Sequence, residues 1–328
     1  PSVSALTRDN EAEYYFAWED QRSGTKRIYG QKISNNELQW DSEGLQISET
    51  AGEDYLQDIV DNYFIWQSYI WPDKDIYVKK VDQDGNAAPG WEENGNPICT
   101  AAGLQENSQG FIIPQGLLVI WEDLRNGTDK DIYGQLINAD GQTQWEEDGK
   151  LLVTAAQDQF NFKFAYSEIE NCFVLTWTDF RNGENTDIYM QKYSVNGNPL
   201  WQINGLPVAL ISDTELKSQT VLAKDSMYVV LWEDYRLGDQ SEIYGQYISA
   251  MGMPQWEENG MLIASGIKNQ KQPQMVFDND GNVISMFKDT RSSGKTDIYN
   301  IYAQRLNIGN VAADNDEIDE NFIVAGKN

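Results

Sequence analysis

Short apolar runs separated by turn residues recur along the whole chain, and they predict β-strands. In residues 218–264 the apolar runs are Gln219–Ala223, Met227–Trp232, Ile243–Ile248 and Met261–Ile263. Runs of this length, bounded by Gly, Asp, Asn and Ser, are typical of strands. Four short antiparallel strands joined by hairpins describe one blade of a β-propeller.

The same pattern occurs six times. A lead aromatic residue marks each copy, and the lead positions are Trp18, Trp66, Trp121, Trp177, Trp232 and Phe287. A second tryptophan follows in five copies, at Trp40, Trp91, Trp145, Trp201 and Trp256. No helical period is evident, and no linkers separate the copies. We therefore expect an all-β fold, a six-bladed β-propeller with four antiparallel strands per blade. We expect a single domain, 1–328, with blades near 1–50, 51–106, 107–162, 163–217, 218–272 and 273–328.

Residues that every blade repeats are expected to serve the fold. The lead tryptophans are interpreted as wedges between neighbouring blades, since a buried Trp removes a large apolar area from water. The alternative is a ring of sugar-stacking platforms. An Asp and an Arg two residues apart follow most lead positions, as in Asp20/Arg22, Asp123/Arg125, Asp179/Arg181, Asp234/Arg236 and Asp289/Arg291. These pairs are expected to hold the following turn; the alternative is a ring of arginines that binds carboxylates or sulfated glycans.

Charge and composition exclude several classes of function. The chain has 24 Lys and Arg against 52 Asp and Glu, a net charge of −28, which disfavours nucleic acid and anionic membrane surfaces as partners. It contains no histidine, which removes the commonest general base and transition-metal ligand. Cys99 and Cys172 lie in different copies and are expected to be free, buried thiols. No stretch is apolar enough to predict insertion into a membrane.

Two acidic turns raise the question of calcium. The phrases Asp82-Gln83-Asp84-Gly85 and Asp278-Asn279-Asp280-Gly281 lie where hairpin turns are expected, and they lack the later Glu of an EF-hand. We interpret them as turns. No cofactor is expected, although Ca²⁺ remains an alternative both here and in the acidic run 314–320.

The copies differ most in the second one. Its turn reads Gln67-Ser68-Tyr69-Ile70-Trp71-Pro72-Asp73, without the Asp and Arg of the other copies. Tyr69 and Trp71 are therefore candidate binding residues for a sugar or a protein partner. The alternative is that they cover the edge of a blade. No catalytic residue is assigned.

The phrases Trp121 to Gln135 and Trp177 to Gln191 combine a strand, Asp-x-Arg-x-Gly and Asp-Ile-Tyr. This pattern resembles the TolB-type propeller repeat. With the added Trp-x-x-x-Gly segment, it is similar to the long-repeat secreted and surface propellers of Bacteroidetes-type bacteria. That resemblance implies an extracellular or cell-surface location. It does not carry over the histidine- and metal-dependent lyase activity of some related propellers.

The expected function is a non-enzymatic extracellular propeller that binds a glycan or a surface or secreted protein, or that serves as a scaffold. The alternative is a carbohydrate-active or calcium-dependent hydrolase that uses carboxylates in the central canal, because paired Asp and Glu cleave glycosides without histidine. Two or more unpaired carboxylates that converge in the canal from non-equivalent blade positions, some about 5–10 Å apart, would favour the enzyme. A canal lined by repeat-equivalent residues would favour a binding module or scaffold.

Overall fold

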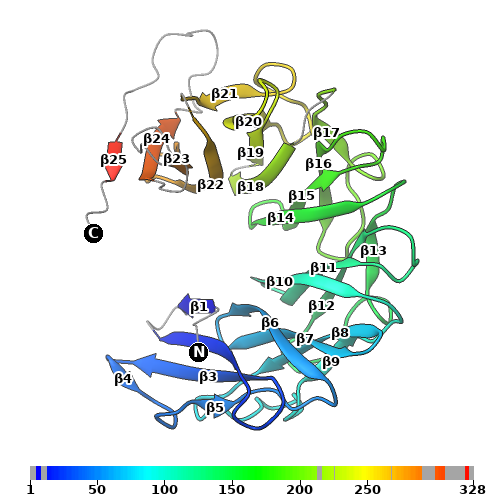
Figure 1. Ribbon diagram of the computed structural model, residues 1–328, viewed down its shortest axis with the longest axis vertical. Coiled ribbons are helices and arrows are strands. Elements are labelled where there is room, and N and C mark those ends of the chain that lie inside the picture. The colour runs from blue at the N-terminus through cyan, green and yellow to red at the C-terminus, as the bar shows by residue number, and fades with distance from the viewer. Residues whose placement is uncertain are drawn as a thin grey trace. The chain divides into compact units, whose positions relative to one another are not determined.

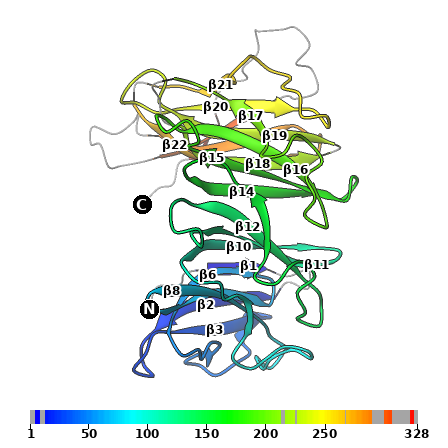
Figure 2. The ribbon, with the colours of Figure 1, turned by 90° about the vertical axis from the view of Figure 1, so that its right-hand side faces the viewer.

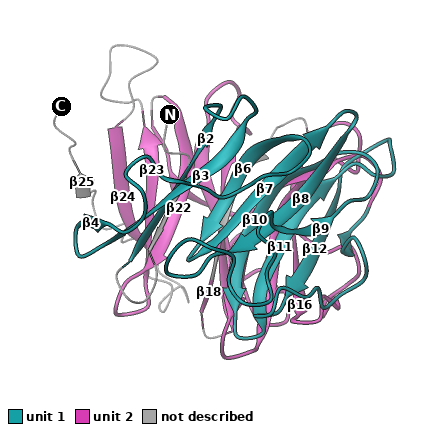
Figure 3. Cartoon of the chain, turned by 90° about the horizontal axis from the view of Figure 1, so that it is seen from below, with its two compact units in different colours: residues 1–154 teal, residues 155–328 magenta. Residues whose placement is uncertain are grey.

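The computed structural model of the protein describes residues 5–8, 13–212, 216–224, 226–266, 268–289, 300–306 and 322–324. The chain divides into two compact units, residues 1–154 and 155–328, which are coloured separately in Figure 3. None of the described segments forms a helix long and apolar enough to cross a membrane.

Unit 1 consists of three antiparallel sheets (Figure 1). The first contains β1 (Ala5–Arg8), β2 (Tyr14–Asp20), β3 (Arg27–Ser34), β4 (Glu37–Leu38) and β5 (Leu45–Gln46). The second contains β6 (Glu53–Val60), β7 (Tyr63–Ile70), β8 (Asp73–Lys80) and β9 (Asn96–Cys99). The third contains β10 (Gln105–Ile113), β11 (Gly116–Asp123), β12 (Asp131–Ile137) and β13 (Lys150–Val153). Neighbouring sheets touch, since β6 lies against β2 and β10 lies against β6 and β7.

Unit 2 also consists of three antiparallel sheets, which can be followed in Figures 1 and 2. The first contains β14 (Gln159–Ser167), β15 (Cys172–Asp179), β16 (Asp187–Ser194) and β17 (Leu206–Ala209). The second contains β18 (Leu216–Lys224), β19 (Met227–Asp234), β20 (Glu242–Ile248) and β21 (Met261–Ala264). The third contains β22 (Gln270–Phe277), β23 (Val283–Asp289), β24 (Asn300–Leu306) and β25 (Phe322–Val324).

The predicted fold class is confirmed. Each sheet joins its strands in chain order by antiparallel hairpins, as a propeller blade does. In the first sheet the fourth position is divided, because β4 and β5 each pair with a different end of β3. The grouping of all six sheets into one domain, with the blade boundaries given above, stays a prediction.

The core of each unit lies between neighbouring sheets. All eight residues of β15 are buried, as are seven of the eight residues of β11, so these central strands are covered on both faces. A strand buried on both faces is apolar at consecutive positions rather than at alternate ones, which explains the run Leu117 to Trp121. The structure also confirms the cysteine prediction, because Cys99 and Cys172 are free and buried.

Hairpin order places one set of loops at a common end of every sheet. The first strand begins at the end where the second strand finishes and the third begins, because successive strands are antiparallel. The register of β10 with β11 shifts between Glu106 and Gln109, where Asn107 has a φ of 54°. Such β-bulges re-aim the side chains next to them. The candidate site lies at this end of the sheets of unit 1.

Candidate functional site

The repeated Asp and Arg form a clamp around the lead tryptophan. In the third sheet, Asp123 accepts hydrogen bonds from Trp121 Nε1 at 2.8 Å and from Arg125 Nε and Nη2 at 3.0 and 2.6 Å. Arg125 Nη2 also donates to the Asp148 carbonyl at 2.8 Å, and its guanidinium lies 3.9 Å from the centre of the Tyr133 ring. The clamp therefore ties the turn to the Trp121 and Tyr133 rings and to the loop before the fourth strand.

Three other sheets contain the same clamp, which we define as a lead Trp, an Asp, an Arg and the Tyr beneath the guanidinium. The equivalent sets are Trp18, Asp20, Arg22 and Tyr29; Trp177, Asp179, Arg181 and Tyr189; and Trp232, Asp234, Arg236 and Tyr244. In each, the arginine also donates to a loop carbonyl. Asp289 is buried at the equivalent position of β23, and Arg291 lies outside the described residues.

The second sheet has no clamp. Ser68 and Ile70 occupy the Asp and Arg positions, and Ile70 pairs directly with Asp73, so the hairpin turns through Trp71 and Pro72 alone. The structure leaves Trp71 82% exposed at the tip of this hairpin, and Tyr69 is partly buried. The two candidate binding residues are therefore placed differently, with Trp71 in solvent and Tyr69 within the sheet.

A charged network also distinguishes unit 1. Its lysines are Lys26, Lys74 and Lys130, and each stands two positions before the isoleucine of the repeated Ile-Tyr phrase. Its carboxylates are Glu19, Glu53, Glu106 and Glu122. We call these seven residues the lysine row. Residues Thr186 and Ser241 stand at the lysine position in the first two sheets of unit 2, so the row is confined to unit 1 among the described sheets.

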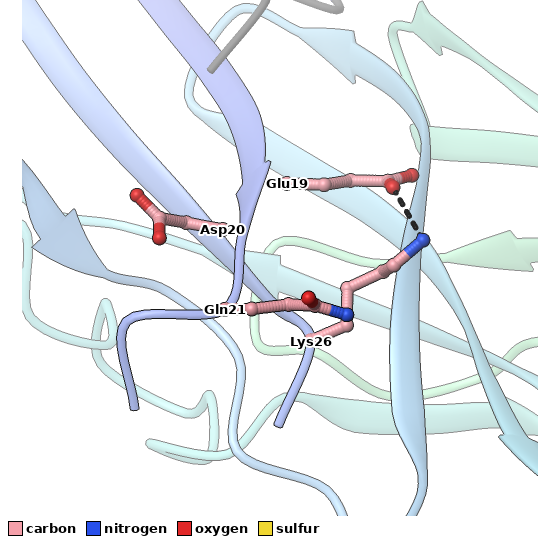
Figure 4. A pocket seen from close by; sticks show the side chains of 4 residues that line it. All are labelled: Glu19, Asp20, Gln21 and Lys26. Carbon is pink, nitrogen blue, oxygen red and sulfur yellow. Dashed lines mark ion pairs between the residues drawn. The ribbon is translucent and has the colours of Figure 1, made fainter. Parts of the chain in front are cut away.

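One end of the lysine row borders a pocket of about 410 Å³. Glu19, Asp20, Gln21 and Lys26 line it (Figure 4). Lys26 Nζ lies 3.1 Å from Glu19 Oε2 and 4.0 Å from the centre of the Tyr55 ring, and the Tyr55 hydroxyl donates to Glu53 at 2.8 Å. Glu19 also accepts a hydrogen bond from a backbone N–H of β6. The pocket therefore has a charged wall and lies where two sheets meet.

The other end of the row brings two carboxylates together. Lys130 Nζ lies 3.3 Å from Glu106 Oε2 and 2.8 Å from Glu122 Oε2, so these two oxygens are at most about 6 Å apart. Lys74 contacts the other oxygen of Glu106. Glu106 lies on the first strand of its sheet and Glu122 on the second. They therefore converge from non-equivalent positions of the repeat, but both are paired with lysines and are not the unpaired carboxylates that the sequence criterion specified.

The environment keeps Glu106 ionised. Burial alone would raise the pKa of Glu106, but hydrogen bonds and positive charge from Lys74 and Lys130 outweigh burial and hold that pKa below its usual value. Burial likewise opposes the charge of Lys130, yet Glu122 and Glu106 raise its pKa. The Glu122 side chain is buried, whereas about a quarter of the Glu106 side chain is exposed. Glu106 is the more accessible of the two carboxylates.

Sequence reasoning missed the lysine row, although a signal was present. A lysine two residues before Ile28, Ile76 and Ile132 is a departure shared by consecutive copies. It is informative only once the strand pairing is known, because pairing places Glu106 beside Glu122, where Lys130 contacts both.

The acidic phrases are hairpin turns in the structure. Asp82 Oδ1 accepts the backbone N–H groups of Asp84 and Asn86 at 2.9 and 3.0 Å. Asp278 does the same for Asp280 and Asn282. No group of three or more Cys, Asp or Glu side chains placed to hold a metal occurs among the described residues. The acidic run 314–320 lies outside them, and binding of Ca²⁺ stays an untested alternative.

Comparison with solved structures shows the fold. A polysaccharide lyase, an ulvan lyase bound to -[GlcA(1-4)Rha3S]-, is 8% identical with a TM-score of 0.56, over 92% of this chain and 79% of the lyase. The α-L-arabinanase of Penicillium chrysogenum, complexed with arabinobiose, is 11% identical with a TM-score of 0.50, over 86% of this chain and 87% of the arabinanase. An α-L-arabinofuranosidase of Fusarium graminearum is 9% identical with a TM-score of 0.49, over 93% of this chain and 92% of the arabinofuranosidase. No protein-family model and no curated protein sequence matches the chain.

This comparison corrects one expectation. A non-enzymatic binding module or scaffold was expected, but the structures that share the fold are carbohydrate-cleaving enzymes. The expectation gave too much weight to the missing histidine, since carboxylates alone can cleave a glycosidic bond. The resemblance to the TolB-type repeat receives no specific support from these structures, whereas the six-bladed propeller fold does.

Proposed function

We propose that the protein is a carbohydrate-active enzyme that hydrolyses a neutral glycan, with Glu106 and Glu122 as its reacting carboxylates. The observation that carries this proposal is their convergence around Lys130, with oxygens no more than about 6 Å apart. The fold that the chain shares with glycan-cleaving enzymes also supports this proposal. The site lies at the loop end of the sheets of unit 1; a place in a central canal stays a prediction.

The separation suits a retaining mechanism. Retaining glycosidases hold their two carboxyl groups about 5–5.5 Å apart, while inverting enzymes leave about 6.5–9.5 Å for a water molecule. Glu106 is the nucleophile, because it is ionised and the more accessible. It bonds to the anomeric carbon while the glycosidic C–O bond breaks and Glu122 gives a proton to the departing oxygen. Water then attacks the anomeric carbon, Glu122 takes its proton, and Glu106 leaves.

Lys130 controls the proton. While its ammonium group contacts both carboxylates, its positive charge offsets one of their two negative charges. A sugar that displaces it leaves two like charges within about 6 Å, and such a pair retains one proton at a higher pH than an isolated carboxyl group does. The pair then contains one acid and one nucleophile, as the double displacement requires.

Charge argues for a neutral substrate. The lysine row contains four carboxylates and three lysines, and the whole chain carries a net charge of −28. A polyuronate or a sulfated chain would be repelled. Tyr69 and Trp71, at the end of the sheet that carries Lys74, would provide aromatic surface for sugar rings. An extracellular or cell-surface location, as the TolB-like repeat implies, agrees with a polymeric glycan as substrate.

The test is release of reducing ends from linear arabinan, arabinobiose and xylan. Glu106→Gln should lower the rate at least about a thousandfold without changing the melting temperature. Proton NMR of the first product should show a retained anomeric configuration. Glu233→Gln is the matched control, since Glu233 is the repeat-equivalent of Glu122 and accepts a backbone hydrogen bond from Gln272 at 2.7 Å. Full activity in the Glu106 variant, or no activity of the unmodified protein on any glycan tried, would contradict the proposal.

A further inference from the structure

The clamp missing from the second sheet leaves a buried donor without an acceptor. Trp66 is fully buried and its Nε1 has no hydrogen-bond partner. In the four clamped sheets the equivalent N–H donates to the aspartate two residues later. Here that residue is Ser68, whose hydroxyl instead contacts Thr50. A buried N–H without an acceptor is costly, so the position favours a ligand that supplies one.

An acceptor and a ring face lie next to this donor. Asp75 pairs with Ser68 and Tyr77 pairs with Trp66 across β7 and β8, so all four residues share one face of the sheet. The rings of Trp66 and Tyr77 are stacked, with centroids 5.9 Å apart and an interplanar angle of 15°. In the clamped sheets an arginine lies over the ring of the equivalent tyrosine, and no cation lies over Tyr77 in the described structure.

Among the described residues, no nearby cation neutralises Asp75. Its charged neighbours are Asp73 and Asp148, and burial together with these two carboxylates raises the pKa of Asp75 to about 6. Arg27, in the adjoining sheet, donates hydrogen bonds to Asp54 at 3.0 Å and to the carbonyls of Thr50 and Gly52. Asp75 is therefore available as an acceptor for a ligand.

From this combination we infer that Trp66, Asp75 and Tyr77 form a sugar-binding subsite in the place that an arginine fills in four other sheets. A sugar hydroxyl accepts a hydrogen bond from Trp66 Nε1 and donates one to Asp75, while the sugar ring lies on Tyr77. A guanidinium group has no acceptor for Trp66, and a carboxylate has no donor for Asp75. Trp71 lies at the tip of the same hairpin, about 10 Å along the strand from Asp75 by strand geometry, and provides surface for a following sugar ring.

The inference rests on the proposed function for its ligand class, but it concerns binding and not turnover. The decisive variant restores the clamp by Ser68→Asp together with Ile70→Arg. It should raise the melting temperature, because Trp66 Nε1 gains an acceptor, and it should weaken binding of arabinobiose and linear arabinan at least about tenfold by calorimetry. A second variant, in which residues 123–130 replace residues 68–74, serves if the double substitution does not fold.

Two further measurements separate this inference from the proposed catalysis. Glu106→Gln should abolish hydrolysis and leave the affinity for arabinan unchanged. If the restored clamp weakens binding although the unmodified protein hydrolyses nothing, the subsite stands and the catalytic proposal fails. If hydrolysis and binding both survive the restored clamp, the subsite is refuted and the catalytic proposal stands. The sugar-binding subsite is supported if guanidinium chloride competes with arabinan for the protein no better than sodium chloride does. It is overturned if the protein binds guanidinium but no glycan, or binds no glycan at all.

Discussion

Removing the clamp arginine of the third sheet should destabilise the protein strongly. Asp123 is fully buried, and Arg125 is the only cation that contacts it in the described structure. In Arg125→Met the carboxylate keeps its bonds from Trp121 Nε1 and from the backbone N–H of residue 125, but it loses two charged donors. Breaking a buried ion pair by removing one partner costs about 3–5 kcal/mol. The two remaining bonds place the expected loss at about 3 kcal/mol.

Two companion variants test the reasoning. Asp123→Asn combined with Arg125→Met should cost less than Arg125→Met alone, because no buried charge is left unpaired. Arg22→Met should cost clearly less as well, because Asp20 in the equivalent clamp is partly exposed and water can replace the guanidinium.

The assay is urea unfolding followed by tryptophan fluorescence and circular dichroism, with the midpoint and slope compared between variants. The explanation is wrong if Arg22→Met and Arg125→Met cost the same, or if adding Asp123→Asn deepens the loss. Either result would mean that the arginine acts through packing on the tyrosine ring and not through its charge.

Four further predictions concern other parts of the chain. Trp71→Ala should weaken glycan binding without lowering the melting temperature, since Trp71 is 82% exposed; a large loss of stability would assign it to the core. Burial raises the pKa of Asp187 to about 6. The protonated form is therefore favoured by folding, and the stability it contributes is complete below pH ~3.9 and lost as the pH rises through about 6. Asp187→Asn should accordingly be more stable than the unmodified protein by about 1 kcal/mol at pH 8, after solvent screening, with no difference near pH 4 in thermal melts. Gly149→Ala should destabilise far more than Gly127→Ala, because a Cβ at Gly149 would lie 2.3 Å from Trp121, whereas the space around Gly127 is open and both glycines have positive φ. A chelator should leave the melting temperature unchanged if the acidic turns act through backbone hydrogen bonds; a clear drop would indicate structural calcium.

The sequence predicts the fold well because the same marker residues occur in successive blades. The lead tryptophan and the Asp-Arg spacing recur, so their interpretation in one copy is checked by the others. Turn chemistry adds independent information, as at Gly149, where only glycine combines positive φ with close contact to an indole ring. The strand bounds follow from these markers, since strands end where the clamp and the hairpin glycines begin.

The candidate site is harder to predict, because it depends on which side chains neighbouring sheets bring together. Glu106 and Glu122 are 16 residues apart and belong to no recognised catalytic spacing. Their proximity follows from the direct pairing of Glu106 with Glu122 across β10 and β11, and Lys130, in the turn before β12, contacts both. Residue type alone does not distinguish Glu122 from Glu233, which shares its place in the repeat but pairs across the strands with Lys217 and not with a glutamate.

Two departures from the repeat lie in unit 1, and they bear on where function lies. The residues that recur in the four clamped sheets are explained by the clamp, so they need no ligand. Lys74 and Lys130 have no such explanation, and neither does the absence of an aspartate at Ser68, which leaves Trp66 without its acceptor at a cost in stability. The first two sheets of unit 2 keep the clamp intact. Activity and glycan affinity should therefore respond to substitutions in the lysine row and the second sheet, while equivalent substitutions in β15 or β19 should change stability alone.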